Sequence, residues 1–103
     1  MIAAERMGLL DALVGEWEMS HVDRYAGFQK GLPSVPTKAR RWIGEMEEIA
    51  KTFVDAGLTP KIFEGGAAEM YRLVGTTALA DETLETFDRE RTLQQVIELL
   101  AKA

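Results

Sequence analysis

The chain has 103 residues, which is enough for one domain with a modest hydrophobic core. Its 17 acidic and 12 basic residues give a net charge of −5, and it contains no cysteine. Disulfides, thiolate metal sites and cysteine nucleophiles are therefore excluded. The acidic balance, with bases interleaved among acids, argues against nucleic acids and anionic membranes as partners.

The N-terminal residues lack the basic start and the long apolar run of a signal peptide. No apolar run approaches the roughly 20 residues that a membrane-spanning helix needs. Together these two features predict a soluble, cytoplasmic protein.

Helical periodicity begins at the start of the chain and predicts a first helix over residues 2–18. Its apolar residues recur at steps of three and four and share one face: Leu9, Leu10, Leu13, Val14 and Trp17. Arg6 falls in the same stripe. Two interpretations of Arg6 stay open: it lies in water at a frayed first turn, or this face meets a segment of chain that precedes the sequence.

Ser20 has the character of a helix N-cap, with Asp23 three residues later in an approximate capping box. A short helix over residues 21–29 is expected to follow. Two prolines and a glycine then mark residues 31–36 as a loop.

The strongest helical pattern runs over residues 36–56. Ser34 is placed to cap this helix, and Pro36 suits its first turn. Its apolar stripe is about 140° wide and comprises Ala39, Trp42, Ile43, Met46, Ile49, Ala50, Phe53 and Val54.

Charged residues within the predicted helix and a glycine at its end give two further expectations. Glu47 and Lys51 are spaced as a favourable i,i+4 ion pair. Gly57 stands where a left-handed C-cap residue belongs, and Leu58 follows as its usual hydrophobic contact. The helix is therefore expected to end at residue 56.

Thr59 and Pro60 predict the cap and first turn of a fourth helix over residues 60–73. Its inward positions are expected to be Ile62, Phe63, Met70 and Val74. Gly65 and Gly66 lie inside this helix, where each costs about 1 kcal/mol relative to alanine. We expect a neighbouring backbone to pack closely on them, or the helix to kink there, because no strand precedes them as a phosphate-binding loop requires.

A polar connection over residues 75–83 leads to a last helix over residues 87–102. The inward positions of this helix are Leu93, Val96, Ile97 and Leu100. No segment alternates polar and apolar residues as a strand does. The sequence therefore predicts an all-α fold, a single domain over residues 1–103 built as a compact bundle of about four to five helices.

Residues able to do chemistry are few. His21 is the only histidine, and no serine stands in a recognisable triad context beside it. No metal-binding motif occurs. The acids Glu45, Glu47 and Glu48 point in different directions around a helix, and Glu45 is the one we expect first to touch a ligand or partner. The sequence thus predicts no catalytic, cofactor-binding or metal-ligating residue.

Two segments of the central helix carry a family resemblance. Arg41–Ala50 and Phe53–Pro60 resemble the helical C-terminal domain of NAD(P)-dependent oxidoreductases of the 6-phosphogluconate dehydrogenase-like, or β-hydroxyacid dehydrogenase, superfamily. Further stretches of similarity to that domain are residues 4–20, 67–73, 79–83 and 91–93.

The resemblance implies a fragment of such an enzyme, a separately encoded remnant of one, or a separately expressed domain. Its members carry an N-terminal Rossmann domain with a glycine-rich dinucleotide fingerprint and a catalytic lysine on the helix that joins the domains, and neither occurs in this sequence. It implies NAD or NADP for a full-length enzyme and none for this chain, which we expect to be inactive alone. It also implies a domain that helps to form the dimer and lines part of the substrate cleft. The expected partners are a second copy, bound through helical surface, and the missing Rossmann domain.

The resemblance carries over four positions as substrate- or interface-facing candidates: Arg41, Glu45, Met46 and Glu48. Two other classes of function stay open. One is a free-standing helical module that binds a protein partner, and the other is a small ligand-binding bundle with Glu45 or His21 in a pocket. The residues that would decide the substrate, and the choice between NAD and NADP, lie outside this sequence.

Overall fold

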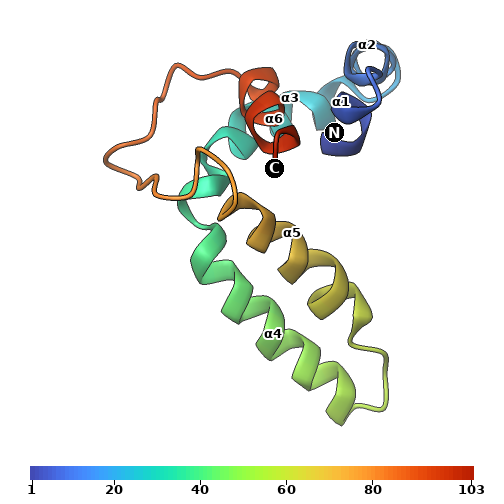
Figure 1. Ribbon diagram of the computed structural model, residues 1–103. Helices are drawn as coiled ribbons and strands as arrows, with labels where there is room; N and C mark the ends of the chain where they lie inside the picture. Colours follow the sequence, from blue (N-terminus) through green and yellow to red (C-terminus); the bar gives the residue numbers. More distant parts are fainter.

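Every regular element of the protein is helical in the computed structural model, which describes all residues, 1–103 (Figure 1). The all-α prediction is confirmed. In chain order the elements are α1 (Ile2–Arg6), α2 (Leu10–Ser20), α3 (Val22–Gly31), the 3-10 helix η1 (Leu32–Thr37), α4 (Ala39–Asp55), the π-helix η2 (Ile62–Ala67), α5 (Ala68–Val74) and α6 (Leu93–Ala101).

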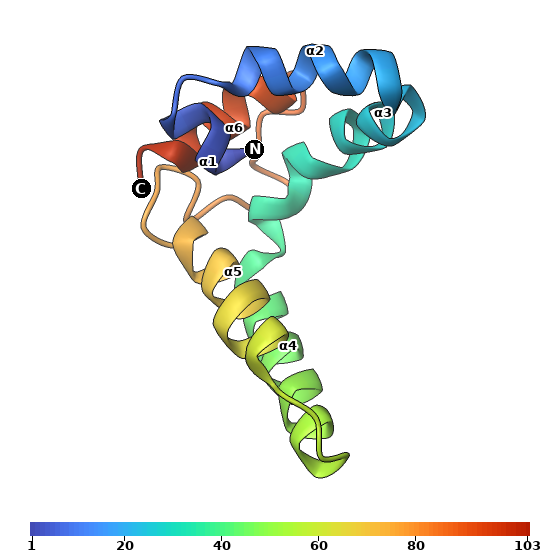
Figure 2. The ribbon, with the colours of Figure 1, turned by 90° about the vertical axis from the view of Figure 1, so that its right-hand side faces the viewer.

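The helices form two parts, which we call the head and the hairpin. The head consists of α1, α2, α3, η1 and α6, and the hairpin, residues 39–74, projects from it as α4 followed by the antiparallel η2 and α5 (Figure 2). The main hydrophobic cluster lies in the head and at the base of the hairpin: Leu10, Val14, Tyr25, Ala39, Val74, Leu79, Leu93, Val96, Ile97 and Leu100. Elsewhere in the hairpin only Ala50 and Ala68 are fully buried. No helix combines the length and the apolar character needed to cross a bilayer.

The predicted first helix is in fact two helices. Between α1 and α2 stands Gly8 with φ +71°, a left-handed conformation that glycine adopts without strain. The break leaves Leu9, predicted to face inward, 49% exposed. Leu10 and Val14 are buried as predicted.

Arg6 has partners within the chain, which neither interpretation of the sequence foresaw. Its Nε donates a hydrogen bond to the carbonyl of Ala101 (2.9 Å), and its Nη2 donates to the carbonyl of Ala103 (2.7 Å). These carbonyls lie at the C-terminal end of α6, where a positive charge also interacts favourably with the helix dipole. Arg6 therefore fastens α1 to α6, which lie side by side in the head.

The prediction that Ser20 caps the second helix pattern is wrong. Ser20 is the last residue of α2, and its hydroxyl donates to the carbonyl of Glu16 one turn back (2.8 Å). α3 begins after His21 without a side-chain cap. α3 packs on α2 through aromatic side chains: Tyr25 is 5% exposed, and the ring centroids of Tyr25 and Phe28 lie 6.3 and 5.4 Å from that of Trp17.

The central helix begins at Ala39, three residues later than predicted. Residues Leu32–Thr37 form η1, with Pro36 buried inside it. The hydroxyl of Ser34 donates to the carbonyl of Gly31 (3.1 Å) and does not cap α4. Proline fits a short 3-10 segment because its fixed φ is already near the helical value.

The predicted end of the central helix is confirmed. Gly57 has φ +74°, and the N–H of Leu58 donates to the carbonyl of Phe53 (2.8 Å), the long bond of a Schellman motif. The side chain of Leu58 nevertheless stays 57% exposed. The motif ends the helix without covering this leucine.

The predicted fourth helix begins at Ile62 as η2, two residues later than predicted and without a side-chain cap. The hydroxyl oxygen of Thr59 accepts a hydrogen bond from the N–H of Lys61 (3.3 Å) just before this segment. Of its predicted inward residues Val74 is buried and Phe63 is half-buried. The other two, Ile62 and Met70, are 65% and 49% exposed, so the prediction is wrong for them.

The close packing predicted at the paired glycines is wrong. A Cβ atom on Gly65 would meet nothing within 4 Å, and one on Gly66 would meet only the carbonyl of Lys61 at 3.9 Å. Both glycines lie in η2, the π-helical segment. π-Helical segments are one of the known causes of bends in helices. The structure at these glycines is therefore closer to the second expectation, a kink, than to close packing.

The last helix, α6, begins at Leu93 and not at residue 87. Thr92 and Gln95 form a capping box: the N–H of Gln95 donates to the hydroxyl of Thr92 (3.2 Å), and the N–H of Thr92 donates to the side-chain oxygen of Gln95 (2.9 Å). All four residues predicted to face inward from this helix are buried.

A loop of turns over residues 75–92 connects α5 to α6. Glu82 and Arg91 form an ion pair across it, with 2.6 Å between Oε1 and Nη1 and side chains 13% and 17% exposed. The geometry is not that of a hydrogen bond, and the second carboxylate oxygen of Glu82 has no hydrogen-bond partner. This pair is the most buried charge contact of the chain.

The protein has a large surface for a chain of its mass. The radius of gyration is 15.0 Å, whereas a compact chain of this length has about 13 Å. The accessible surface is 6840 Å², about 1,000 Å² more than expected for a folded monomer of this mass. The wide apolar stripe of α4 is covered by one neighbouring helix, so most of its large residues are only half-buried.

Candidate functional site

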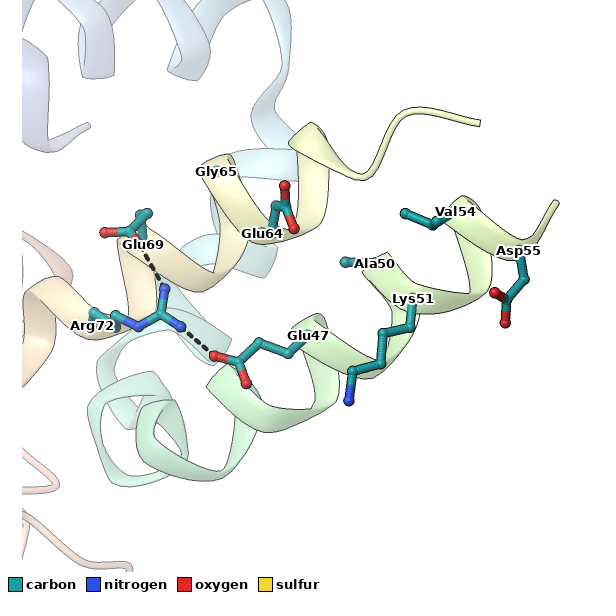
Figure 3. A pocket seen from close by; sticks show the side chains of 9 residues that line it. All are labelled: Glu47, Ala50, Lys51, Val54, Asp55, Glu64, Gly65, Glu69 and Arg72. Atoms are coloured by element: carbon teal, nitrogen blue, oxygen red, sulfur yellow. Dashed lines mark hydrogen bonds and ion pairs between the residues drawn. The ribbon is translucent and has the colours of Figure 1, made fainter. Parts of the chain in front are cut away.

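The largest hollow of the molecule is an open groove along one side of the hairpin, with a volume of about 640 Å³. We call this side of the hairpin the groove side. Its lining comes from α4 on one wall and from η2 and α5 on the other (Figure 3): Glu47, Ala50, Lys51, Val54, Asp55, Glu64, Gly65, Glu69 and Arg72. The end near the head holds Glu47, Glu69 and Arg72, and the end toward the hairpin tip holds Val54, Asp55, Glu64 and Gly65.

Arg72 closes the end of the groove nearest the head. Its Nη1 donates to Glu69 one turn earlier on α5 (2.6 Å), and its Nη2 donates to Glu47 on α4. Figure 3 shows the guanidinium reaching between the two helices. All three side chains are 41% to 61% exposed, so solvent weakens the attraction and each pair contributes at most about 1 kcal/mol.

Lys51 forms an ion pair with Glu48 (2.9 Å) and not with Glu47, so the predicted Glu47–Lys51 pair is wrong. The reason is that Arg72 from α5 already occupies the carboxylate of Glu47. The hydrogen bond to Glu48 is the main cause that raises the pKa of Lys51 above its ordinary value.

The groove is acidic and contains carboxylates without partners. Asp55 and Glu64 make no ion pair within the chain, whereas the two cations of the lining, Lys51 and Arg72, are both engaged. No three His, Asp or Glu side chains of the chain are arranged to hold a metal ion. The groove therefore presents mainly charged side chains beside Ala50 and Val54, and no cluster able to hold a metal ion.

The four residues carried over from the family resemblance lie outside the groove lining. Arg41 and Glu45 pair with each other along α4 (3.4 Å) with side chains 68% and 53% exposed, and Glu48 pairs with Lys51. Met46 is half-buried. The structure thus gathers Arg41, Glu45 and Glu48 on an exposed row of α4, and their assignment as substrate- or interface-facing residues stays a prediction.

His21 lies in the corner between α2 and α3, in the head. It is exposed, and its Nδ1 lies 2.8 Å from the hydroxyl of Ser20. Neither His21 nor Glu45 lines any of the five main hollows of the molecule.

Sequence reasoning missed the contact that defines the groove. The pairing of Glu47 with Arg72 spans 25 residues of sequence and depends on how α4 and α5 are aligned. Two signals were available: Glu47 lies at the edge of the apolar stripe, and Glu69 and Arg72 are spaced at i,i+3 on the facing helix.

Comparison with known proteins supplies one match. A family model described as "Domain of unknown function (DUF1932)" matches residues 4–74. Neither the curated proteins nor the solved structures gave a significant match. The matched range includes α2 to α5, and hence the entire groove, and it spans more than half of the chain. The protein belongs to the DUF1932 family.

Proposed function

We propose that this chain is the C-terminal helical domain of an NAD(P)-dependent oxidoreductase of the 6-phosphogluconate dehydrogenase-like superfamily. In such an enzyme it contributes to the dimer and to the substrate cleft, and by itself it is inactive. One observation carries the proposal. The family match covers residues 4–74 and so includes the segment Arg41–Pro60, on which the resemblance to these dehydrogenase domains rests.

The all-α fold supports the part of the proposal that concerns the cofactor. A dinucleotide site of the Rossmann type is built at the carboxyl ends of parallel strands, with the pyrophosphate on a helix N-terminus that follows a glycine-rich turn. All 103 residues are described here and none is in a strand. In this proposal NAD or NADP binds to a separate Rossmann domain that supplies the catalytic lysine.

The hairpin offers two separate surfaces for the two roles. The exposed row with Arg41, Glu45 and Glu48 carries charged groups suited to a polar substrate. The groove and the hairpin tip carry exposed apolar residues suited to a protein contact, Val54 in the groove and Leu58 and Ile62 at the tip. We assign the substrate cleft to the first surface and subunit contact to the second.

Calorimetric titration of the purified chain with NADH and NADPH tests the assignment of the cofactor to another domain. We expect no heat of binding, and low-micromolar binding of either dinucleotide would overturn the proposal. The coding sequence upstream of Met1 gives a second test. An in-frame glycine-rich dinucleotide motif is the expected result.

The alternative of a free-standing protein-binding module makes the opposite prediction for that second test. A promoter and a start codon directly before Met1, with no dehydrogenase domain encoded nearby, would favour the module over the enzyme domain. The exposed apolar residues of the hairpin tip are the structural observation in its favour.

A further inference from the structure

We infer that the ion pair between Glu82 and Arg91 is a latch, which holds residues 82–91 closed as a compact loop and which, on opening, lets each charged group pair with another residue. We call residues 82–91 the Ω-loop. This segment lies outside the residues 4–74 that the family model matches. The inference therefore does not rest on the proposed dehydrogenase role.

The Ω-loop is closed at its base and packed by its own side chains. The charged atoms of its two end residues approach to 2.6 Å, and loops of about 6–16 residues with such close ends are a compact class that is often functional. Within the loop, the N–H of Thr83 donates to the hydroxyl of Thr86 (2.9 Å), and the guanidinium carbon of Arg89 lies 4.9 Å from the ring centroid of Phe87. Figure 1 shows this segment in the long orange connection between α5 and α6. Its internal contacts allow the Ω-loop to move as a unit when its base opens.

The closed pair leaves hydrogen bonds unmade. The Oε2 atom of Glu82 and the Nη1 atom of Arg91 are both buried, and neither has a hydrogen-bond partner in the chain. A buried ion pair needs its remaining donors and acceptors to be bonded as well, because both ions lose their hydration. An open form, in which both groups regain water or other partners, is therefore accessible from the closed one. The closed form is the one that the structure shows, so the open form is the minor state.

Another partner for Glu82 lies in a hollow at the base of the hairpin. Glu82 lines this hollow, of about 200 Å³, together with Arg40 of α4. Arg40 is held loosely, because its Nη2 lies 3.8 Å from Asp81 and the two side chains are 85% and 99% exposed. Asp81 directly precedes Glu82 in the sequence. Arg40 therefore has to shift by only one residue to pair with the freed carboxylate.

Other partners for Arg91 lie in a different hollow, along α6. This hollow has a volume of about 300 Å³, and Asp88 and Glu98 line it together with Arg91. Both acids are exposed, and neither belongs to an ion pair. A freed Arg91 therefore meets two unpaired carboxylates in the hollow that it already lines.

The two hollows meet at the latch. Glu82 lines one hollow and Arg91 lines the other, and the hollows share no lining residue. The closed pair therefore stands between them, and its opening joins them into one cleft that extends from the start of α4 to α6. Two alternative sets of ion pairs give the latch two discrete states, as a conformational switch requires.

Trypsin cleavage after Arg91 measures how often the latch is open. In the closed form the side chain of Arg91 is 17% exposed and paired, so it cannot enter the specificity pocket of the protease. Every protein compared carries Arg89→Gln, which leaves Arg91 as the only trypsin site of the Ω-loop. The rate at which the fragment beginning at Thr92 appears then follows the population of the open form. Glu82→Gln, which removes the closed pair, should raise this rate by about tenfold or more.

Removing the alternative partners should disfavour the open form. Arg40→Gln is expected to lower the cleavage rate by about three- to fivefold, because it deletes an exposed ion pair that forms on opening. The double variant Asp88→Asn with Glu98→Gln should lower the rate by about the same factor, for the same reason on the other side of the latch. All three side chains are exposed, so these variants keep the fold.

Matched controls remove the same charges elsewhere in the head. They are Arg24→Gln in α3, and Glu16→Gln with Glu18→Gln in α2, all at positions outside both hollows. The controls should leave the cleavage rate unchanged. The inference is overturned if the variants of the alternative partners leave the rate unchanged, or if the controls lower it equally. A Glu82→Gln protein that is cleaved no faster than its parent would also overturn it.

Amide hydrogen exchange repeats the comparison with Arg89 intact. The N–H of Phe87 donates to the carbonyl of Thr83 (3.0 Å), and the N–H of Arg91 donates to the carbonyl of Asp88 (3.2 Å). Both amides should exchange faster in Glu82→Gln and more slowly when the alternative partners are removed. Exchange rates at these two amides that do not follow the order of the cleavage rates would contradict a loop that opens as a unit.

Discussion

Glu82 and Arg91 join the two ends of a ten-residue stretch of the connecting loop through an ion pair with 2.6 Å between their charged atoms. Both side chains are more than four-fifths buried. The pair stands directly before α6, whose four buried residues fill the head. A buried ion pair thus holds together the loop that precedes α6, the helix whose apolar residues pack in the core.

Removing one member of this pair should destabilise the protein more than any surface substitution. Glu82→Ala leaves the charge of Arg91 buried without a counter-ion, at a cost of about 2–4 kcal/mol in free energy of unfolding. The double variant Glu82→Leu with Arg91→Met should recover most of that loss, because neither charge remains. Urea denaturation of the three proteins measures both values, and a double variant no more stable than Glu82→Ala would contradict the explanation.

Arg6→Ala should loosen the contact between α1 and α6. It removes two hydrogen bonds to carbonyls at the end of α6, which together contribute about 1–2 kcal/mol at an exposed site. Amide hydrogen exchange should show faster opening in residues 97–103 than in the hairpin. Arg24→Ala, which removes an arginine of α3 without an ion-pair partner, serves as the control and should change neither quantity.

Two glycine substitutions should have opposite effects on the monomer. Gly65→Ala should raise the free energy of unfolding by about 0.5–1 kcal/mol, because its Cβ meets nothing and alanine favours the helix. Gly57→Ala should lower it by about 1 kcal/mol, because φ is +74° there. Thermal unfolding at low protein concentration measures the two shifts. A destabilising Gly65→Ala would mean that the helix packs closely there after all.

The link between α4 and α5 should be weak and sensitive to salt. Arg72→Ala removes two exposed ion pairs, one of which joins the helices, and should cost about 1 kcal/mol at low ionic strength. Most of that difference should vanish at about 1 M salt, where the screening length falls to about 3 Å. Arg41→Ala, whose pair with Glu45 lies within one helix, should cost less under both conditions.

Tyr25 should make the protein less stable at high pH. Burial, and to a smaller degree the charge of Glu18, raise the pKa of the Tyr25 phenol above its ordinary value of 10.0. The unfolded chain therefore ionises first, and stability that is constant below pH 10 falls as pH rises toward the folded-state pKa. Tyr25→Phe should remove this part of the pH dependence and change stability at neutral pH by less than about 1.5 kcal/mol. Denaturation at several alkaline pH values compares the two proteins.

Helix faces were predicted best where packing is densest. Leu93, Val96, Ile97 and Leu100 are all buried as their spacing indicates, because α6 is surrounded by the head. The same rule failed for Ile62 and Met70, which the periodicity placed inside and the structure exposes. Periodicity identifies an apolar face, but it does not say whether another helix is present to cover that face.

Helix starts are predicted less well than helix faces. A serine hydroxyl can cap the helix that follows it, or it can bond to a carbonyl of the turn before it. Ser20 and Ser34 were assigned as caps, yet each hydroxyl bonds to a carbonyl of the preceding turn. The capping box of Thr92 and Gln95 was equally visible in the sequence and went unused, because the helix was expected to begin at residue 87. A serine or threonine is typical of a helix terminus, but the surrounding residues determine whether a helix begins or ends there.

The groove could not be predicted from helix patterns alone. It depends on the π-helical segment η2 and on the alignment of α4 with α5, which brings Arg72 to Glu47. Neither feature follows from the spacing of apolar residues. The residues of α4 that the resemblance carries over are Arg41, Glu45, Met46 and Glu48, and none of them lines the groove. The resemblance indicates which helix is involved, but it does not indicate which face of that helix meets the groove.

The hydrogen bonds from Arg6 to the C-terminal end of α6 have a consequence for the order in which the chain folds. The two residues it joins are 95 positions apart, so closing this contact brings together nearly the whole chain, at an entropic cost that grows only slowly with loop length. During synthesis the N-terminal helices leave the ribosome well before α6. Until those last residues emerge, Leu10 and Val14 lack the four α6 residues of the hydrophobic cluster to which they belong, and the apolar faces of the head stay more exposed to water.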